Sequence, residues 1–252
     1  MSISGQSGVG RVRLFNDFCG PEVPVANAVA YGTTAGGCNY YLGDFSLKGD
    51  LVETDTGAVA LSKASGYIRL GGNNEDGKGA ALCTEVCFSP ALNGSIVVEA
   101  RLERAAITAG VVFVGLAGTI ADDVAEPCTS TGTTITKVVP CVGFVLDSQL
   151  TAGTYWHMPY LLASDTSQTS TDVDASQVAV AGESDILRLV VNSDGSAEWW
   201  INGKLEQTKG AGLATTTTTL MGALVGCWGT TTTAASVDVD YFLVEANRDW
   251  TR

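Results

Sequence analysis

Residues 186–207 read ILRLVVNSDGSAEWWINGKLEQ, and this stretch decides the fold. Its apolar residues alternate with others on both sides of an Asp194-Gly195 turn, and a second turn signal follows at Asn202-Gly203. Asp-Gly and Asn-Gly accept the positive φ angles that tight hairpin turns need. Because side chains two residues apart point to the same side of a strand, we predict one buried face formed by Leu187, Leu189, Val191, Ala197, Trp199 and Ile201.

The rest of the chain reads as short strands between turns, and no segment has the periodicity of an amphipathic helix. Residues 110–118 are apolar on both faces, which predicts a central strand covered on both sides. The last strand is expected to place Val237, Val239, Tyr241 and Leu243 on one face. We therefore predict an all-β fold, an antiparallel β-sandwich of the jelly-roll type. Its other strands are expected at residues 11–18, 59–61, 67–70, 81–88, 95–104, 138–147, 154–162, 220–228 and 235–245.

The domain organisation is expected to be simple. The chain has 252 residues, a length that suits one large sandwich. Residues 1–10 are rich in Gly and Ser and are expected to form a flexible N-terminal arm, with residues 11–252 forming one domain. Three segments read as long loops, namely residues 20–49, 120–137 and 164–177. Long irregular segments typically serve a function or an interface.

The charge balance excludes several classes of partner. The chain holds 27 acidic and 14 basic residues, a formal net charge of −13. This excess repels phosphate backbones and anionic membranes, so we expect neither nucleic acid nor a membrane as a partner. The first residues lack the apolar stretch of a secretory signal, so we expect synthesis in the cytoplasm without export. The seven cysteines are then expected to stay reduced.

Candidate catalytic groups are few. Glu99 and Glu103 share a strand face with an arginine between them, which is typical of a charge-paired, solvated face. Asp238 and Asp240 also share a face, as a calcium pair or as the outward side of a terminal strand. The one histidine, His157, lies in an aromatic cluster, where packing is its expected role. We therefore expect no catalytic site, no cofactor and no bound metal, and we do not expect an enzyme.

An aromatic residue on an outward face is the main candidate for binding. If the alternation holds, Trp200 points away from the core beside Glu198, with Arg188 on the neighbouring strand. We assign Trp156 and Tyr160 to the same interaction patch. Mixed apolar and polar patches serve both protein interfaces and sugar sites. A third possibility is that Trp200 is covered by a loop or by the flank of the second sheet.

The order of these features resembles a known superfamily. An apolar strand, an Asp-Gly turn, an aromatic strand and an Asn-Gly turn occupy residues 187–204, and residues 237–244 form a final Asp-x-Asp-Tyr strand. This pattern resembles the concanavalin-like jelly roll, which holds legume-type lectins, laminin-G-like domains and laminarinase-type glycoside hydrolases. The resemblance implies the fold and leaves the activity open. The Glu-x-Asp-x-x-Glu string of the laminarinase-type enzymes does not occur in this sequence.

The front half, from residues 15–18 (FNDF) to residues 112–117 (VFVGLA), resembles virion proteins of tailed bacteriophages. That resemblance implies a capsid decoration, or cement, protein located in the virion. Its partners would be the major capsid protein and copies of itself, in a homo-oligomer. Two alternatives stay open. One is a carbohydrate-binding, lectin-like module of a fibre or host-recognition protein, which would bind a glycan, and the other is a diverged glycoside hydrolase.

Overall fold

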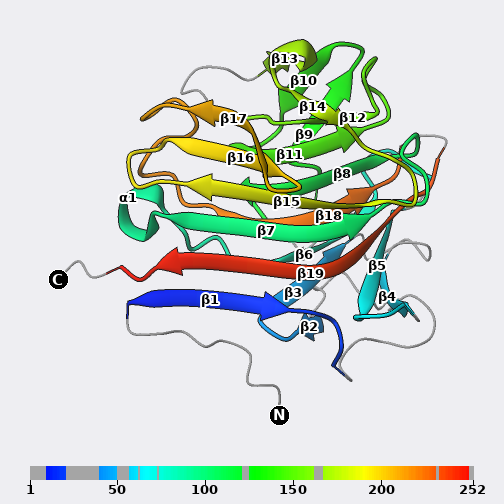
Figure 1. Ribbon diagram of the computed structural model, residues 1–252, viewed down its shortest axis with the longest axis horizontal. Coiled ribbons are helices and arrows are strands. Elements are labelled where there is room, and N and C mark those ends of the chain that lie inside the picture. The colour runs from blue at the N-terminus through cyan, green and yellow to red at the C-terminus, as the bar shows by residue number, and fades with distance from the viewer. Residues whose placement is uncertain are drawn as a thin grey trace.

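The computed structural model describes residues 10–20, 40–49, 57–61, 63–72, 74–120, 125–161, 167–230 and 233–249. Two large antiparallel sheets lie face to face, and a small third sheet stands at one end of them (Figure 1). We name the large sheets after their central strands, the β7 sheet and the β8 sheet. The predicted all-β, antiparallel β-sandwich is confirmed.

The β7 sheet faces the viewer in Figure 1 and has eight strands within the described residues. Its long strand β19 (Ala235–Asn247) pairs on one side with β7 and on the other with two strands in turn, β5 near its start and β1 near its end. The order across the sheet is β17 (Lys204–Lys209), β16 (Ala197–Ile201), β15 (Ser184–Val191), β7 (Ile96–Glu103), β19, β5 (Tyr67–Gly72) and β4 (Gly57–Leu61), with β1 (Arg11–Asn16) beside β19.

The β8 sheet lies behind it and also has eight strands in the described part of the chain. Their order is β14 (Asp174–Val178), β12 (Tyr155–His157), β11 (Cys141–Asp147), β8 (Val111–Ala117), β18 (Gly222–Trp228), β6 (Gly79–Cys83), β3 (Phe45–Gly49) and β2 (Tyr40–Leu42). The third sheet contains β13 (Ser167–Thr169), β10 (Thr134–Lys137) and β9 (Cys128–Thr131). The described helices are two short turns, α1 (Pro90–Asn93) and η1 (Ser170–Asp172).

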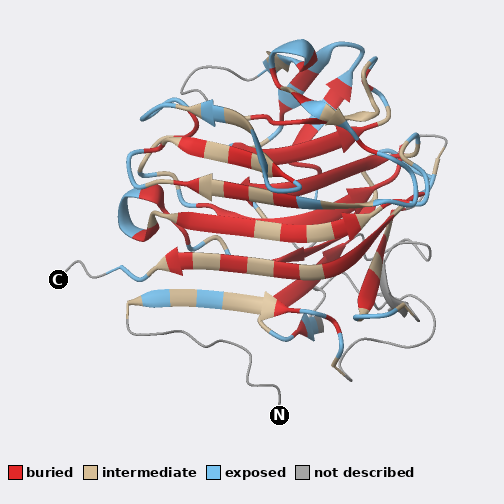
Figure 2. Ribbon diagram, in the orientation of Figure 1, coloured by how far each residue is buried: buried red, intermediate tan, exposed pale blue. Residues whose placement is uncertain are grey.

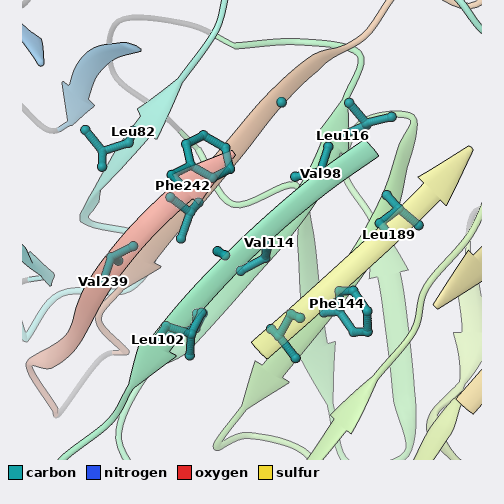
Figure 3. Packing of buried hydrophobic residues seen from close by; sticks show 14 of the residues in the cluster. Leu82, Val98, Leu102, Val114, Leu116, Phe144, Leu189, Val239 and Phe242 are labelled. Atoms are coloured by element: carbon teal, nitrogen blue, oxygen red, sulfur yellow. The ribbon is translucent and has the colours of Figure 1, made fainter. Parts of the chain in front are cut away.

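The inner faces of the two large sheets form the main core. The predicted hairpin forms β15 and β16, and the six residues predicted for its buried face are all at most 1% exposed. Trp199 crosses this core, because its indole nitrogen donates a hydrogen bond to the carbonyl of Gly143 in β11 at 2.8 Å. Figure 3 shows the apolar side chains that meet between the sheets, among them Leu82, Val98, Leu102, Val114, Leu116, Phe144, Leu189, Val239 and Phe242.

The β8 sheet buries its outer face as well, in a second apolar cluster. Along β8, Val112, Val114 and Leu116 belong to the main core, whereas Val111 and Phe113 belong to this second cluster. The hairpin β9–β10 and the segments around it cover the outer face with Cys128, Ile135, Leu150 and Val173. We call these segments the cover. The prediction that residues 110–118 form a central strand covered on both sides is confirmed, and β8 is buried along its whole length (Figure 2).

Strand β19 departs from the predicted alternation. Val237 and Val239 point inward as predicted, but the pairing with β7 shifts between Val239 and Tyr241. A bulge of this kind adds one residue and reverses the faces beyond it. The buried positions therefore become Phe242, Val244 and Ala246, and the prediction that Tyr241 and Leu243 share the face of Val237 is wrong.

All three segments predicted as long loops contain regular structure, and residues 20–49 include β2 and β3. Residues 120–137 include β9 and β10, and residues 164–177 include β13, η1 and part of β14. The strand expected at residues 81–88 ends at Cys83. The predicted arm, except Gly10, and most of the loop at residues 20–49 lie outside the described residues. Among the residues that the structure describes, no helix has the length and hydropathy needed to span a membrane.

Candidate interaction surface

The outer face of the β7 sheet carries pairs of opposite charge. Glu99 accepts hydrogen bonds from the Arg188 guanidinium and from the Tyr241 hydroxyl, each at 2.8 Å. Arg101 donates to Asp240 at 2.6 Å. Burial, followed by the hydrogen bond to Glu99, raises the pKa of Tyr241 above its usual range. The charge-paired face predicted for Glu99 and its neighbours is confirmed.

Asp238 is held most firmly on this face. It is 2% exposed, and it accepts hydrogen bonds from Lys63 at 2.7 Å and from Arg69 at 2.6 and 2.9 Å. Burial opposes ionisation of this carboxyl, but the donors from Arg69 and Lys63 outweigh it and lower the pKa of Asp238. Lys63 also bridges to Glu103 at 2.9 Å. Asp238 and Asp240 thus lie on the outer side of β19, each ion-paired with cationic side chains.

One region of the same face is apolar. Trp200 in β16 lies opposite Arg188 in β15 and opposite Leu205 in β17, so the three side chains share the outer face. Ile186 stands two residues before Arg188 on the same side, and Ile186 and Leu205 are 37% and 42% exposed. The Trp200 indole donates to Glu198 at 3.1 Å. We call these residues the edge patch: Ile186, Arg188, Glu198, Trp200 and Leu205.

The structure separates the five residues predicted for the interaction patch. Trp200, Glu198 and Arg188 lie together, as predicted. Trp156 does not belong with them, because it is 1% exposed and its indole donates inward to Asp185 at 2.9 Å. Tyr160 is partly buried at the side of the sandwich, where its ring packs against Trp199 and lies under the Lys209 ammonium group at 4.2 Å. Ile186 joins the patch through the alternation of β15, and Leu205 joins it through strand register, which the sequence alone does not give.

The strand that borders the edge patch is fastened to the opposite sheet. Glu206 in β17 accepts hydrogen bonds from the backbone nitrogen of Ser176 at 2.7 Å and from Gln177 at 3.1 Å, both in β14 of the β8 sheet. Lys204 adds an ion pair at 2.8 Å. Burial opposes ionisation of Glu206, but these donors outweigh it and lower its pKa to about 2. The edge patch therefore rests on a strand that is anchored to both sheets.

Polar groups are also buried on the covered side of the β8 sheet, and among them the sequence analysis singled out only His157. Asp147 and His157 are both 0% exposed, and the His157 Nδ1 atom lies 2.9 Å from a carboxylate oxygen of Asp174. Burial, followed by the charges of Asp147 and Asp76, raises the pKa of Glu126 to about 8. A carboxyl in this environment is neutral at pH 7. Among the described residues, no group of three or more His, Cys, Asp or Glu side chains is arranged to hold a metal ion.

A small hollow opens at the end of β11. It has a volume of about 210 Å³, and most of its lining residues carry hydroxyl groups: Thr108, Ser148, Leu150, Thr151, Gly153 and Thr154. Hydroxyl and backbone groups of this kind can donate and accept hydrogen bonds to a polyhydroxylated ligand. None of its lining residues belongs to the edge patch.

Comparison with solved structures places this architecture among known folds. The chain is similar to a protein of unknown function from Shewanella oneidensis MR-1, with a TM-score of 0.58, 10% identity, and coverage of 99% of this chain and 92% of that one. It is also similar to peanut lectin, with a TM-score of 0.52, 11% identity, and coverage of 94% and 97%. The carbohydrate recognition domain of Emp46p matches with a TM-score of 0.52, 10% identity, and coverage of 85% and 96%.

No protein-family model matches the sequence, and no curated protein matches it either. Identities of 10 and 11% establish the fold and nothing finer. The strand topology and the lectin neighbours together lead to one conclusion: this chain has the concanavalin-like β-sandwich fold.

Proposed function

We propose that this chain is a structural binding module that works by docking, and that its specific role is to decorate and stabilise the capsid of a tailed bacteriophage. The edge patch is the observation that carries the proposal. It places a tryptophan and two exposed aliphatic side chains side by side on a face whose other groups are ion-paired. Interface centres are enriched in tryptophan and arginine, and buried tryptophan often dominates the binding energy.

The proposed partners are the major capsid protein and further copies of this chain. A module that binds the assembled shell and not its free subunits stabilises the shell by mass action. Attachment through the edge patch would leave the covered side of the β8 sheet pointing outward. The protein would then reside in the virion.

The proposal includes no chemical reaction. A retaining glycosidase needs one ionised carboxylate and one protonated carboxylic acid close together. On the open face, hydrogen bonds from Arg69 and Lys63 lower the pKa of Asp238, and Asp240 accepts a hydrogen bond from Arg101. Glu99 and Glu103 are held in the same way by Arg188 and Lys63. Each of these carboxylates is thereby occupied in holding the sheet face together.

The test is cosedimentation with shells assembled from the major capsid protein of the same genome. The unaltered chain should pellet with the shells and raise the temperature at which they disassemble. Trp200→Glu should weaken binding by at least roughly 30-fold, because a tryptophan at the centre of an interface contributes about 2 kcal/mol or more to the binding free energy. Leu220→Glu is the matched control, because Leu220 is 52% exposed outside the edge patch, and it should bind normally.

Two outcomes would count against the proposal. Failure of the unaltered chain to bind any shell would remove the capsid role. Full binding by a folded Trp200→Glu variant would remove the edge patch as the docking surface.

The hydroxyl-lined hollow favours a second candidate, a carbohydrate-binding module. Sugars offer hydroxyl groups that match such a lining, and this hollow is separate from the edge patch. A glycan array with the purified chain tests it. Under this candidate, Thr151→Val should lower glycan binding at least several-fold, while the exposed Thr208→Val change in β17 should not. An array on which no glycan binds above background would eliminate this candidate.

A further inference from the structure

Two buried cysteines meet where the cover joins the β8 sheet. Cys128 is the first residue of β9 and Cys141 the first residue of β11, and they are 1% and 0% exposed. The carbonyl oxygen of Pro127 accepts a hydrogen bond from the backbone nitrogen of Val138 at 3.0 Å and from the Cys141 thiol at 3.7 Å. Pro127 is bonded to Cys128, so the Cys141 sulfur lies against the peptide group that leads into Cys128.

The Cys141 side chain also lies near enough to Cys128 to raise the pKa of the Cys128 thiol. Both cysteines are fixed by strand pairing, since Cys128 lies opposite Lys137 in β10 and Cys141 lies opposite Ala117 in β8. A disulfide requires neighbouring backbones that already hold two sulfur atoms close together. Other described thiols have different partners: Cys83 contacts Ser46, and Cys19 contacts the carbonyl of Ser65.

From this arrangement we infer that Cys128 and Cys141 are a modification site, a dithiol that forms an intrachain disulfide and fastens the cover to the β8 sheet. The bond would close a loop containing the whole β9–β10 hairpin. It would tie the first strand of the cover to β11, which pairs with β8 at the centre of the covered sheet. Neither cysteine belongs to the edge patch, so the site is independent of docking.

The co-reactant is a low-molecular-weight disulfide of the glutathione class. One cysteine thiolate attacks the glutathione disulfide, forming a mixed disulfide and releasing one glutathione thiolate. The second cysteine thiolate then attacks the protein sulfur of the mixed disulfide, which forms the Cys128–Cys141 bond and releases the second glutathione. Two protein thiols are oxidised and one glutathione disulfide is reduced to two thiols.

The environment of the pair determines when the reaction can occur. The hydrogen bond with Cys141, followed by burial, raises the pKa of Cys128 well above its ordinary value, so the reactive thiolate is scarce in the folded chain. Exchange is therefore expected while the chain folds, before the cover closes over the sulfur atoms. Once formed, the disulfide would be shielded from reductants by the same burial.

The experiment is refolding of the full chain from urea in a buffer of oxidised and reduced glutathione, followed by peptide mapping without reduction. We expect a peptide linked through Cys128 and Cys141, and a melting temperature roughly 5–10 °C above that of the chain refolded in dithiothreitol. Cys141→Ser and Cys128→Ser should each abolish both the linked peptide and the shift. Cys83→Ser, the matched buried control, should keep both.

The mapping needs no variant, so the inference remains testable if a serine substitution prevents folding. Recovery of Cys128 and Cys141 as free thiols or as separate glutathione adducts would overturn it. Linkage of either residue to a different cysteine would overturn it as well.

Discussion

Trp200 and Trp228 both point away from the main core, one from the β7 sheet and one from the β8 sheet. Trp228 is nevertheless 0% exposed, whereas Trp200 is only partly buried and adjoins the exposed Leu205. Figure 2 shows the same contrast along the strands, because β7, β15 and β16 carry intermediate or exposed positions among their buried ones while β8 is buried throughout.

The contrast has a structural cause. The β8 sheet is overlaid by its own hairpin β9–β10 and the neighbouring segments, which form a second apolar cluster with it. The β7 sheet has no such cover among the described residues. Its outer face carries ion-paired side chains and the edge patch. The strand alternation therefore defines which residues share a face, but distant segments decide whether that face stays open for a partner.

The largest expected difference is between the two tryptophans themselves. Trp228→Ala should lower the free energy of unfolding by about 3–5 kcal/mol, because it empties a fully buried site. Trp200→Ala should lower it by less than about 1 kcal/mol, because little of its contact is lost on an open face. Urea unfolding of the two variants measures both values. Equal losses would mean that the two outer faces do not differ in the way described.

A second prediction uses Glu126, whose pKa is raised to about 8. Since an unfolded glutamate has a pKa of about 4.3, the folded chain binds more protons between these values, and stability should fall as the pH rises from about 4.5 to about 8. Glu126→Gln removes this loss and should be more stable than the unaltered chain at pH 8 by roughly 2–4 kcal/mol. Unfolding measured at pH 5 and pH 8 checks the difference. A parallel pH dependence in both proteins would contradict the burial of this carboxyl.

Gly226 gives a prediction of intermediate size. A Cβ atom added there would lie 2.4 Å from the Trp228 ring and 2.9 Å from the Ala81 Cβ atom. Gly226→Ala should therefore cost about 1–3 kcal/mol, because the indole must move within a packed cluster. Gly203→Ala is a useful comparison, since nothing lies within 4 Å of a Cβ atom there and only the positive φ of 79° opposes the change. A tolerated Gly226→Ala change would show that the cover is loosely packed.

The smallest expected effect concerns Asp238 on the open face, whose pKa is lowered. A lowered pKa means that the stability from this group is present above its unfolded value of about 3.9 and is lost as the pH falls through the folded value. Asp238→Asn should cost about 1 kcal/mol at pH 7, since the partner cations are partly solvated. The cost should shrink in unfolding experiments carried out near pH 3. A difference that stays constant with pH would mean that the ion pairs contribute nothing.

Several features of this molecule could be predicted from the sequence, and particular residues explain the rest. The hairpin of β15 and β16 and the double burial of β8 follow from alternation and from an apolar run. The cover could not be found in this way, because β9 and β10 consist largely of threonine, serine and a lysine, whose burial depends on the sheet beneath them. The bulge in β19 reverses the faces of Tyr241 and Leu243, and it depends on pairing with β7.

The candidate site could likewise be predicted only in part, because some of its residues depend on contacts between distant segments. Trp200, Glu198 and Arg188 share a face through local alternation and strand pairing. Trp156 lies on a short strand whose side-chain direction is set by its contact with Asp185 in the other sheet. Leu205 enters the edge patch because a register shift in β17 brings it opposite Trp200.

Hydroxyl-radical footprinting of the free chain, read by mass spectrometry at each tryptophan, tests most directly whether one outer face is open and the other closed. We predict that Trp200 is oxidised at least several times faster than Trp228, Trp199 and Trp156, which are each at most 1% exposed. Comparable oxidation of Trp228 and Trp200 would contradict the account, because it would mean that the cover does not close the β8 sheet.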